Sequence, residues 1–114
     1  MKYFDISEFD CKETGQNEMD KDFLDRLDKL REACGFPFVI TSGYRALSHS
    51  MEIKKAKPGT HTQGIAADIA VSNGYDRARI VQFAIELGFA GIGVANSFVH
   101  VDTRPGELVM WVYQ

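Results

Sequence analysis

The sequence contains little that would direct the protein to nucleic acid, to a membrane or to a secretion pathway. Its 13 basic and 16 acidic residues leave a formal net charge of -3, which argues against a broad electrostatic contact with nucleic acid or anionic lipid. No apolar run is long enough to cross a bilayer. Residues 1–5 turn acidic at once and lack the apolar stretch of a signal peptide. We therefore expect no nucleic-acid partner and no membrane span, and a chain that stays in the cytosol or reaches its target without a leader.

Cysteine is also scarce, and two common sequence signatures of zinc are missing. Cys11 and Cys34 are the only cysteines, they form no CxxC pair, and no HExxH segment occurs. The two thiols could form a disulfide between the N-terminal segment and the first predicted helix, or they could remain unpaired and partly buried. The sequence leaves both alternatives open.

The length of 114 residues, with 45% hydrophobic and 25% charged residues, suits one soluble globular domain. The sequence shows no repeat, low-complexity segment or interdomain linker. After an extended N-terminal arm, residue patterns predict a helix that ends at Gly35, a strand at 38–41, a short helix within 46–58, a strand at 65–71, a helix at 76–87, and strands at 89–94, 98–103 and 108–113. This order predicts an α+β fold for residues 1–114, with a small, mainly antiparallel sheet and helices packed on one side.

Two histidines and one aspartate form a candidate metal site. His61 lies in the loop before the predicted strand that carries Asp68, and His100 lies on a later strand. Two neutral imidazoles and one carboxylate can hold zinc and leave a fourth position open, which is typical of catalytic rather than structural zinc. A single histidine is more often an exposed or hydrogen-bonded residue than a ligand. Spacing alone therefore leaves both interpretations open.

Three sequence blocks favour the metal site. They are Ser42-Gly43-Tyr44-Arg45, the segment HTQGIAAD from His61 to Asp68, and Val99-His100-Val101-Asp102. Together they resemble the D-Ala-D-Ala carboxypeptidase family of zinc peptidases, which includes phage L-alanyl-D-glutamate endopeptidases. The blocks span most of the chain in the family's order. Hedgehog signalling domains are similar to this family in fold.

The resemblance implies a zinc peptidase that hydrolyses a peptide bond in peptidoglycan stem peptides, with a hedgehog/D-Ala-D-Ala peptidase-like fold. It places the zinc ligands at His61, Asp68 and His100, and a catalytic and substrate-binding arginine at Arg45. It also implies action on the cell wall, and the small size is consistent with a phage origin. The bond that is cut and the oligomeric state are not indicated.

The sequence departs from the family pattern at two positions. The serine two residues before the first ligand histidine is Gly59 here, and Thr60 supplies the nearest hydroxyl. Many relatives carry an acidic residue three positions before the last histidine, where this chain has Ser97, which cannot take a proton from an activated water at neutral pH. Asp102 shares a strand face with His100. It is therefore either the proton acceptor or a partner that orients a histidine.

Four further residues have alternative interpretations. His49 follows Arg45 by one helical turn, so it either meets a substrate oxygen or is a solvent-exposed helix residue. Tyr44 is a second candidate for contact with substrate. Trp111 and Tyr113 are expected to be core or edge-strand residues.

Three functional hypotheses follow. The first is a zinc peptidase that acts on peptidoglycan. The second is a zinc-bound but non-catalytic module that recognises the cell wall or forms part of a phage structure, and the missing acidic residue at Ser97 motivates it. The third is a metal-free globular domain.

Overall fold

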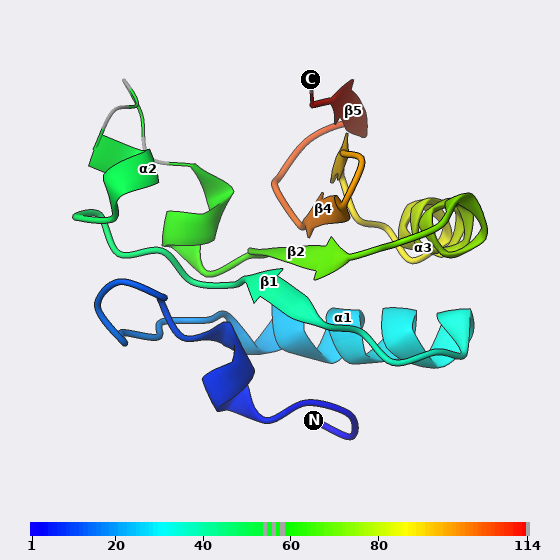
Figure 1. The fold of residues 1–114 in the computed structure, drawn as a ribbon, viewed down its shortest axis with the longest axis horizontal. Coiled ribbons are helices and arrows are strands. Elements are labelled where there is room, and N and C mark those ends of the chain that lie inside the picture. The colour runs from blue at the N-terminus through cyan, green and yellow to red at the C-terminus, as the bar shows by residue number, and fades with distance from the viewer. Residues whose placement is uncertain (54, 56, 58, 114) are drawn as a thin grey trace.

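The computed structural model of the chain describes residues 1–53, 55, 57 and 59–113. Its elements are shown in Figure 1, and in chain order they are the 3₁₀ helix η1 (Ile6–Phe9), α1 (Lys21–Cys34), β1 (Ile40–Ser42), α2 (Ser50–Ile53), the 3₁₀ helix η2 (Thr60–Gln63), β2 (Ala66–Ala70), α3 (Gly74–Glu86), β3 (Gly91–Val94), β4 (Phe98–Asp102) and β5 (Val109–Val112). The predicted helices and strands are present, mostly with slightly shorter bounds. No helix in the described part of the chain is long and apolar enough to span a bilayer.

The five strands form one sheet in the order β1-β2-β4-β3-β5. The pairs β1–β2, β2–β4 and β3–β4 are antiparallel, and β3–β5 is parallel. This arrangement confirms a mixed α+β fold with a mainly antiparallel sheet. The order also places β4 between β2 and β3, so that β2 and β4 are neighbours although α3 and β3 separate them in the chain.

The boundaries of α1 follow from its terminal residues. The Asp20 carboxylate accepts a hydrogen bond from the backbone N–H of Phe23 at 2.9 Å, and this caps the first turn. Gly35 ends the helix with φ 79°, a left-handed conformation that costs glycine little. Between these ends, one stripe of the helix is buried, made of Phe23, Leu24, Leu27, Leu30 and Cys34. The helix therefore forms to cover the sheet.

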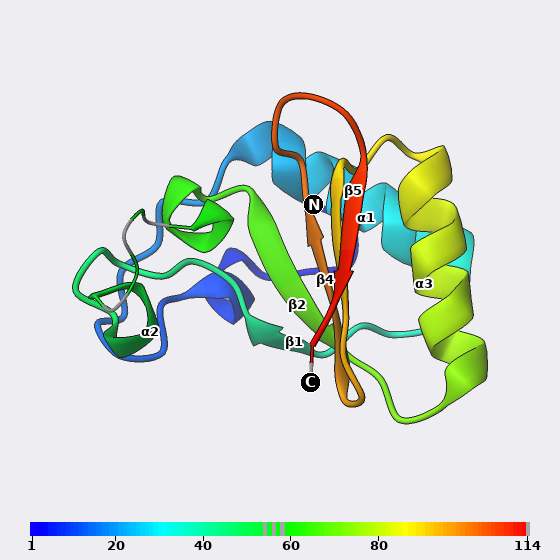
Figure 2. The same ribbon diagram turned by 90° about the horizontal axis from the view of Figure 1, so that it is seen from above.

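The two faces of the sheet have different roles because side chains alternate along each strand. Ala67 and Ile69 of β2 and Val99 and Val101 of β4 belong to the main hydrophobic core, together with buried residues of α1 and α3. The alternate positions on these strands point to the opposite face and carry the polar residues of the candidate site. In Figure 1, α1 lies beneath β1 and β2, while Figures 1 and 2 both show α2 and α3 at opposite ends of the molecule.

The N-terminal arm supports the turn that follows β1. Phe9 is fully buried, and its carbonyl accepts a hydrogen bond from Tyr44 N–H at 2.8 Å. A Cβ added at Gly43 would lie 2.6 Å from the Phe9 Cα, so only glycine permits this approach. Cys11 and Cys34 are both buried and free, which excludes the disulfide that the sequence had left open.

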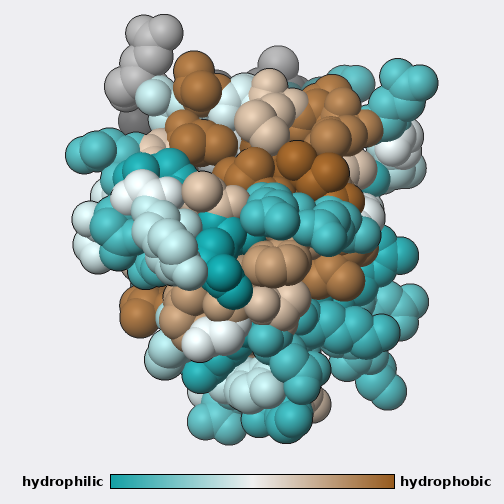
Figure 3. Space-filling model, turned by 90° about the vertical axis from the view of Figure 1, so that its right-hand side faces the viewer, coloured by the Kyte–Doolittle hydropathy of each residue, from teal (hydrophilic) through white to brown (hydrophobic). Residues whose placement is uncertain are grey.

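Strand β5 lies at an edge of the sheet and is the least buried strand. Met110 and Val112, which pair with the core-facing Ile92 and Val94, are 48% and 71% exposed. Apolar side chains gather on the upper part of the molecular face drawn in Figure 3, which looks onto the side of the molecule where α3 and β5 lie in Figure 1. Trp111, which alternates with Met110 and Val112 on β5, lines the cleft of the candidate site, as described next.

Candidate metal centre

Three elements bring His61, Asp68 and His100 together. Asp68 and His100 are direct cross-strand partners in the β2–β4 ladder, and His61 comes from η2, which immediately precedes β2. All three side chains are buried, and one possible ligand atom from each lies within 4.8 Å of the others. The three residues therefore form a group that could hold a metal ion.

The hydrogen-bond partners of the two histidines define their tautomers. The Nδ1 of His61 lies 2.8 Å from the carbonyl oxygen of Gly43, and since a carbonyl only accepts, Nδ1 must carry the hydrogen. The Nε2 of His100 lies 2.7 Å from Oδ2 of Asp102, and its Nδ1 lies 3.1 Å from Oδ1 of Asp68. A neutral His100 that donates from Nε2 to the closer carboxylate therefore leaves Nδ1 as an acceptor. In the neutral imidazoles, the remaining ring nitrogens then present lone pairs.

Both of these nitrogens lie close to the same oxygen. Oδ1 of Asp68 lies 3.3 Å from Nε2 of His61 and 3.1 Å from Nδ1 of His100. In these neutral tautomers three acceptor atoms face one another without a hydrogen between them and repel, so a cation among them stabilises the arrangement. A proton or a metal ion can fill that place, and two imidazole nitrogens with one carboxylate oxygen are suitable ligands for zinc.

The pKa shifts of Asp68 and His100 indicate a site that binds cations. Burial by itself would raise the pKa of Asp68, but the His100 and His61 imidazoles outweigh it and hold that pKa well below its usual range. Burial would lower the pKa of His100, but its hydrogen bonds to Asp102 and Asp68 outweigh it and raise that pKa. The two carboxylates therefore hold positive charge in the site.

Asp102 is completely buried, and its carboxylate contacts Nε2 of His100. It accepts hydrogen bonds from Nε and Nη2 of Arg104 at 2.9 and 2.8 Å and from the Thr60 hydroxyl at 3.3 Å. A Cβ at Gly91 would overlap this carboxylate, so a glycine on β3 makes room for it. Burial would raise the pKa of Asp102, but its bonds to His100 and Arg104 keep it well below the usual range. This geometry favours the orienting role over that of proton acceptor.

Arg45 lies beside the triad but is already engaged. Its Nη1 is 3.1 Å from Oε2 of Glu52, its Nη2 is 3.7 Å from Oδ2 of Asp68, and its Nε donates to the Ser42 hydroxyl at 3.2 Å. Glu52 is buried and also accepts from Lys55 Nζ at 2.9 Å and from Gly59 N–H at 2.8 Å. Burial would raise the pKa of Glu52, but these donors lower it to about 2.

The triad opens into a cleft of about 650 Å³. Its walls come from β1 and the turn after it, from α2 and the segment after it, from η2, and from β2, β4 and β5 with the residues that follow β4 and β5. The cleft is lined by Thr41, Ser42, Arg45, Met51, Lys55, Gly59, Thr60, His61, Asp68, Phe98, His100, Arg104, Trp111 and Tyr113. A Cβ at Gly93 would lie 2.6 Å from Nε1 of Trp111 and 2.7 Å from the Tyr113 ring. Glycine on β3 therefore lets Trp111 of β5 and Tyr113, which follows β5, lie over the sheet, with Trp111 beside His100.

Comparison with known families identifies the chain. Residues 2–102 match the family described as peptidase M15. The chain belongs to the peptidase M15 family. No curated protein sequence matches it. Members of this family are metal-dependent peptidases, similar to zinc D-Ala-D-Ala carboxypeptidases, and the matched range contains all three residues of the candidate metal site.

Two further candidates of this M15 chain, Tyr44 and His49, lie outside the lining of the cleft. Tyr44 is buried against Cys11 and Ala46, and its hydroxyl donates to Glu18 at 2.9 Å. His49 lies 3.4 Å from Glu13, near the start of α2. Neither side chain is among those that line the cleft, so these positions give no support to direct substrate contact.

Several residues in and directly behind the cleft of the M15 domain were not predicted from its sequence. Arg104 follows His100 and Asp102 at the same two-residue spacing, so strand alternation continued beyond β4 would have indicated it. Trp111 is on an edge strand as expected and Tyr113 directly follows that strand, but their place above the site depends on the pairing of β5 with β3. Glu52 had no signal, because it lies in a short polar segment without clear periodicity.

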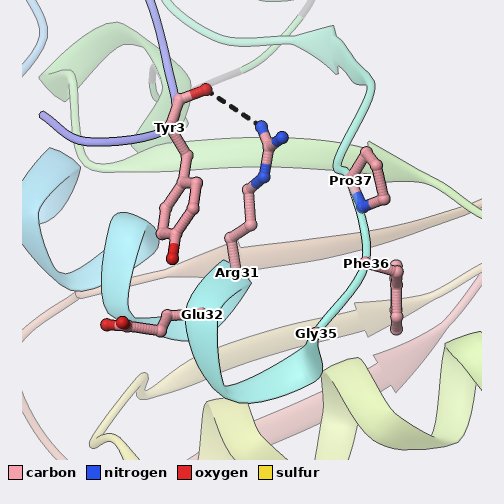
Figure 4. Close-up of a pocket in the computed structure, with 6 residues that line it drawn as sticks. All are labelled: Tyr3, Arg31, Glu32, Gly35, Phe36 and Pro37. Carbon is pink, nitrogen blue, oxygen red and sulfur yellow. Dashed lines mark hydrogen bonds between the residues drawn. The ribbon is translucent and has the colours of Figure 1, made fainter.

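A smaller pocket of about 260 Å³ lies at the C-terminal end of α1. Figure 4 shows its lining, in which the Arg31 guanidinium donates to the Tyr3 carbonyl beside Gly35, Phe36 and Pro37. This pocket lies where the N-terminal arm packs against the helix. It holds no histidine or cysteine, and the chemistry of the M15 site lies in the larger cleft.

Proposed function

We propose that the protein is a zinc peptidase that hydrolyses a peptide bond in peptidoglycan stem peptides, of the D-Ala-D-Ala carboxypeptidase or endopeptidase type. The convergence of two oriented histidine nitrogens on one oxygen of Asp68 carries the metal part of this proposal. Family membership supports the peptidase part. The substrate class and the action on the cell wall rest on the resemblance of the three sequence blocks. We also propose that residues 1–114 form one domain with a hedgehog/D-Ala-D-Ala peptidase-like architecture.

The residues of the site would have the following roles. His61, Asp68 and His100 would bind zinc, which supplies a Lewis acid that polarises a peptide carbonyl and acidifies a water. Asp102 would keep His100 in the tautomer that binds metal. Arg45 would place positive charge beside Asp68, where a substrate carbonyl or carboxylate oxygen approaches.

The proton acceptor is the open step of this scheme. In the described part of the chain, Asp68 is the one carboxylate that lines the cleft, and two histidines already contact it. Asp102 and Glu52 are buried and bound by cations. This observation favours a second candidate function, a zinc-bound module that recognises cell-wall peptides without cutting them.

One experiment separates the two functions. Purified protein is loaded with zinc and incubated with peptidoglycan, with D-Ala-D-Ala peptides and with L-Ala-D-Glu peptides, and products are followed by mass spectrometry. Zinc-dependent cleavage that chelator and His61→Ala both abolish is expected for the peptidase. Binding to the same peptides without cleavage would instead establish the recognition module. Failure to bind stoichiometric zinc, measured by elemental analysis, would refute both.

A further inference from the structure

Arg104 is placed differently from the other cations of the cleft. It follows β4 and reaches back to Asp102 with two of its three nitrogens, Nε and Nη2. Its guanidinium carbon lies 4.9 Å from the centre of the Trp111 ring, so the planar group lies against an aromatic face. The side chain is 34% exposed and lines the cleft. It is thus held firmly while part of it stays open to a ligand.

The geometry of a guanidinium leaves one edge available. The group carries five N–H donors arranged along its edges, and the edge formed by Nε and Nη2 is taken up by Asp102. Among the residues that the structure describes, Nη1 of Arg104 has no hydrogen-bond partner. The edge formed by Nη1 and Nη2 can therefore bind a second carboxylate through two parallel hydrogen bonds.

Arg45 offers no comparable edge. Its Nε, Nη1 and Nη2 face Ser42, Glu52 and Asp68 respectively. A ligand carboxylate would have to displace one of these partners, whereas at Arg104 it would not. Of the two arginines in the cleft, Arg104 is therefore the better preorganised receptor.

The charge of the cleft also favours an anion. Among the residues that the structure describes in and directly behind the cleft, three cations, Arg45, Lys55 and Arg104, are matched by three carboxylates at Asp68, Asp102 and Glu52. Their formal charges cancel, so a bound divalent metal leaves the site with a net charge of about +2. A peptide that carries a carboxylate beside the metal would reduce this charge.

We propose that the free edge of Arg104, supported by the Trp111 ring, is a subsite for a carboxylate group of the peptide substrate. The inference deepens the proposed function and rests on it for the identity of the ligand as a peptide. The carboxylate could be the C-terminus of a D-Ala-D-Ala peptide or the carboxylate of a D-glutamate residue. The two sources share the same chemistry at Arg104 and are separated by the experiment below.

The experiment uses the fluorescence of Trp111, which is the only tryptophan of the chain. Zinc-loaded protein is titrated with N-acetyl-D-Ala-D-Ala and with its C-terminal amide, and separately with N-acetyl-L-Ala-D-Glu amide and its D-Gln counterpart. At least one acid is expected to bind about 10- to 100-fold more tightly than its neutral partner, because charged hydrogen bonds are stronger than neutral ones. The pair that shows the preference identifies the source of the carboxylate.

Variants of Arg104 test whether that preference belongs to this residue. Arg104→Gln is expected to bring the ratio of acid to amide affinity close to one, and Arg104→Lys is expected to retain part of it because the charge remains. Arg26→Gln, on the exposed side of α1, is the matched control and should keep the full ratio. Circular dichroism and zinc affinity are measured for each variant, so that loss of folding or of metal is recognised.

Two results would overturn the proposal. One is equal affinity of the wild type for acid and amide in both pairs. The other is an Arg104→Gln variant that weakens acid and amide by the same factor, since Arg104 would then act only by holding Asp102. These outcomes are distinct from failure of the peptidase function, because the titration requires no turnover. Selective binding without cleavage would refute the peptidase alone, and cleavage without selectivity would refute the subsite alone.

Discussion

Glu52 is the residue whose replacement most directly tests the buried charge network beside the cleft. Its side chain is 0% exposed and is held by Arg45, Lys55 and the backbone N–H of Gly59. Glu52→Gln keeps the shape and can still accept from Gly59, but it removes the negative charge between two cations. We expect the variant to be less stable than the wild type and to release Arg45 from its present position.

The size of the effect follows from the pKa of Glu52. Burial opposes ionisation of Glu52, but the three hydrogen-bond donors outweigh it and lower the pKa of Glu52 from 4.5 to about 2. A difference of about 2.5 pKa units at about 1.4 kcal/mol per unit corresponds to about 3.5 kcal/mol of folding free energy at neutral pH. We therefore expect Glu52→Gln to lower the free energy of unfolding by about 2 to 3 kcal/mol at pH 7, since the amide retains one hydrogen bond.

The same pKa sets how the effect depends on pH. The folded-state pKa of Glu52 lies below the unfolded value, so its contribution is present in full above about pH 4.5 and is lost as the pH falls toward 2. At pH 3 the expected contribution is about 1.4 kcal/mol. The wild type and Glu52→Gln should therefore become more alike in stability as the solution is acidified.

Urea denaturation followed by circular dichroism at pH 7, 5, 4 and 3 measures this difference. Glu107→Gln, in the exposed loop after β4, makes the same chemical change without burial and should have almost no effect. A Glu52→Gln variant as stable as the wild type at pH 7 would refute the reasoning. A stability difference that stays constant from pH 7 to pH 3 would show that the loss does not arise from the charge of Glu52.

Three further predictions concern the metal site, a turn and the cysteines. Asp102→Asn should weaken zinc binding about 10- to 100-fold, because the partner that orients a ligand histidine loses its charge. Competition with a chromophoric chelator measures the zinc affinity, and an unchanged affinity would contradict the orienting role. Gly64→Ala should destabilise the protein by about 1 to 3 kcal/mol more than Gly15→Ala in urea denaturation, since both glycines have positive φ but only a Cβ at Gly64 would overlap neighbouring backbone. Equal losses of stability in the two variants would show that this overlap does not matter. Cys11 and Cys34 are free and buried, so a reducing agent should leave the melting temperature unchanged, and a thiol reagent should react slowly until urea unfolds the protein. A melting temperature that falls under reduction would indicate a disulfide.

Local sequence rules determined the secondary structure and the alternation of faces. Gly35 ends α1 as expected and Asp20 caps its start, because a left-handed glycine and a cap act within one turn of helix. Asp68 and His100 face away from the apolar positions of their strands, because that alternation depends only on the extended backbone. The candidate metal triad was likewise predicted from residue type, spacing and resemblance to the family.

The tertiary structure alone decided which residues surround that triad. The sequence leaves two roles possible for Asp102, and its contacts with His100 and Arg104 favour the orienting role. Trp111 reaches the cleft because β5 pairs in parallel with β3, and Glu52 enters the network because the short segment around α2 folds against Arg45. Periodicity states which way a side chain points from its own element. It contains no information on which element lies opposite, and only the packing of distant segments sets that.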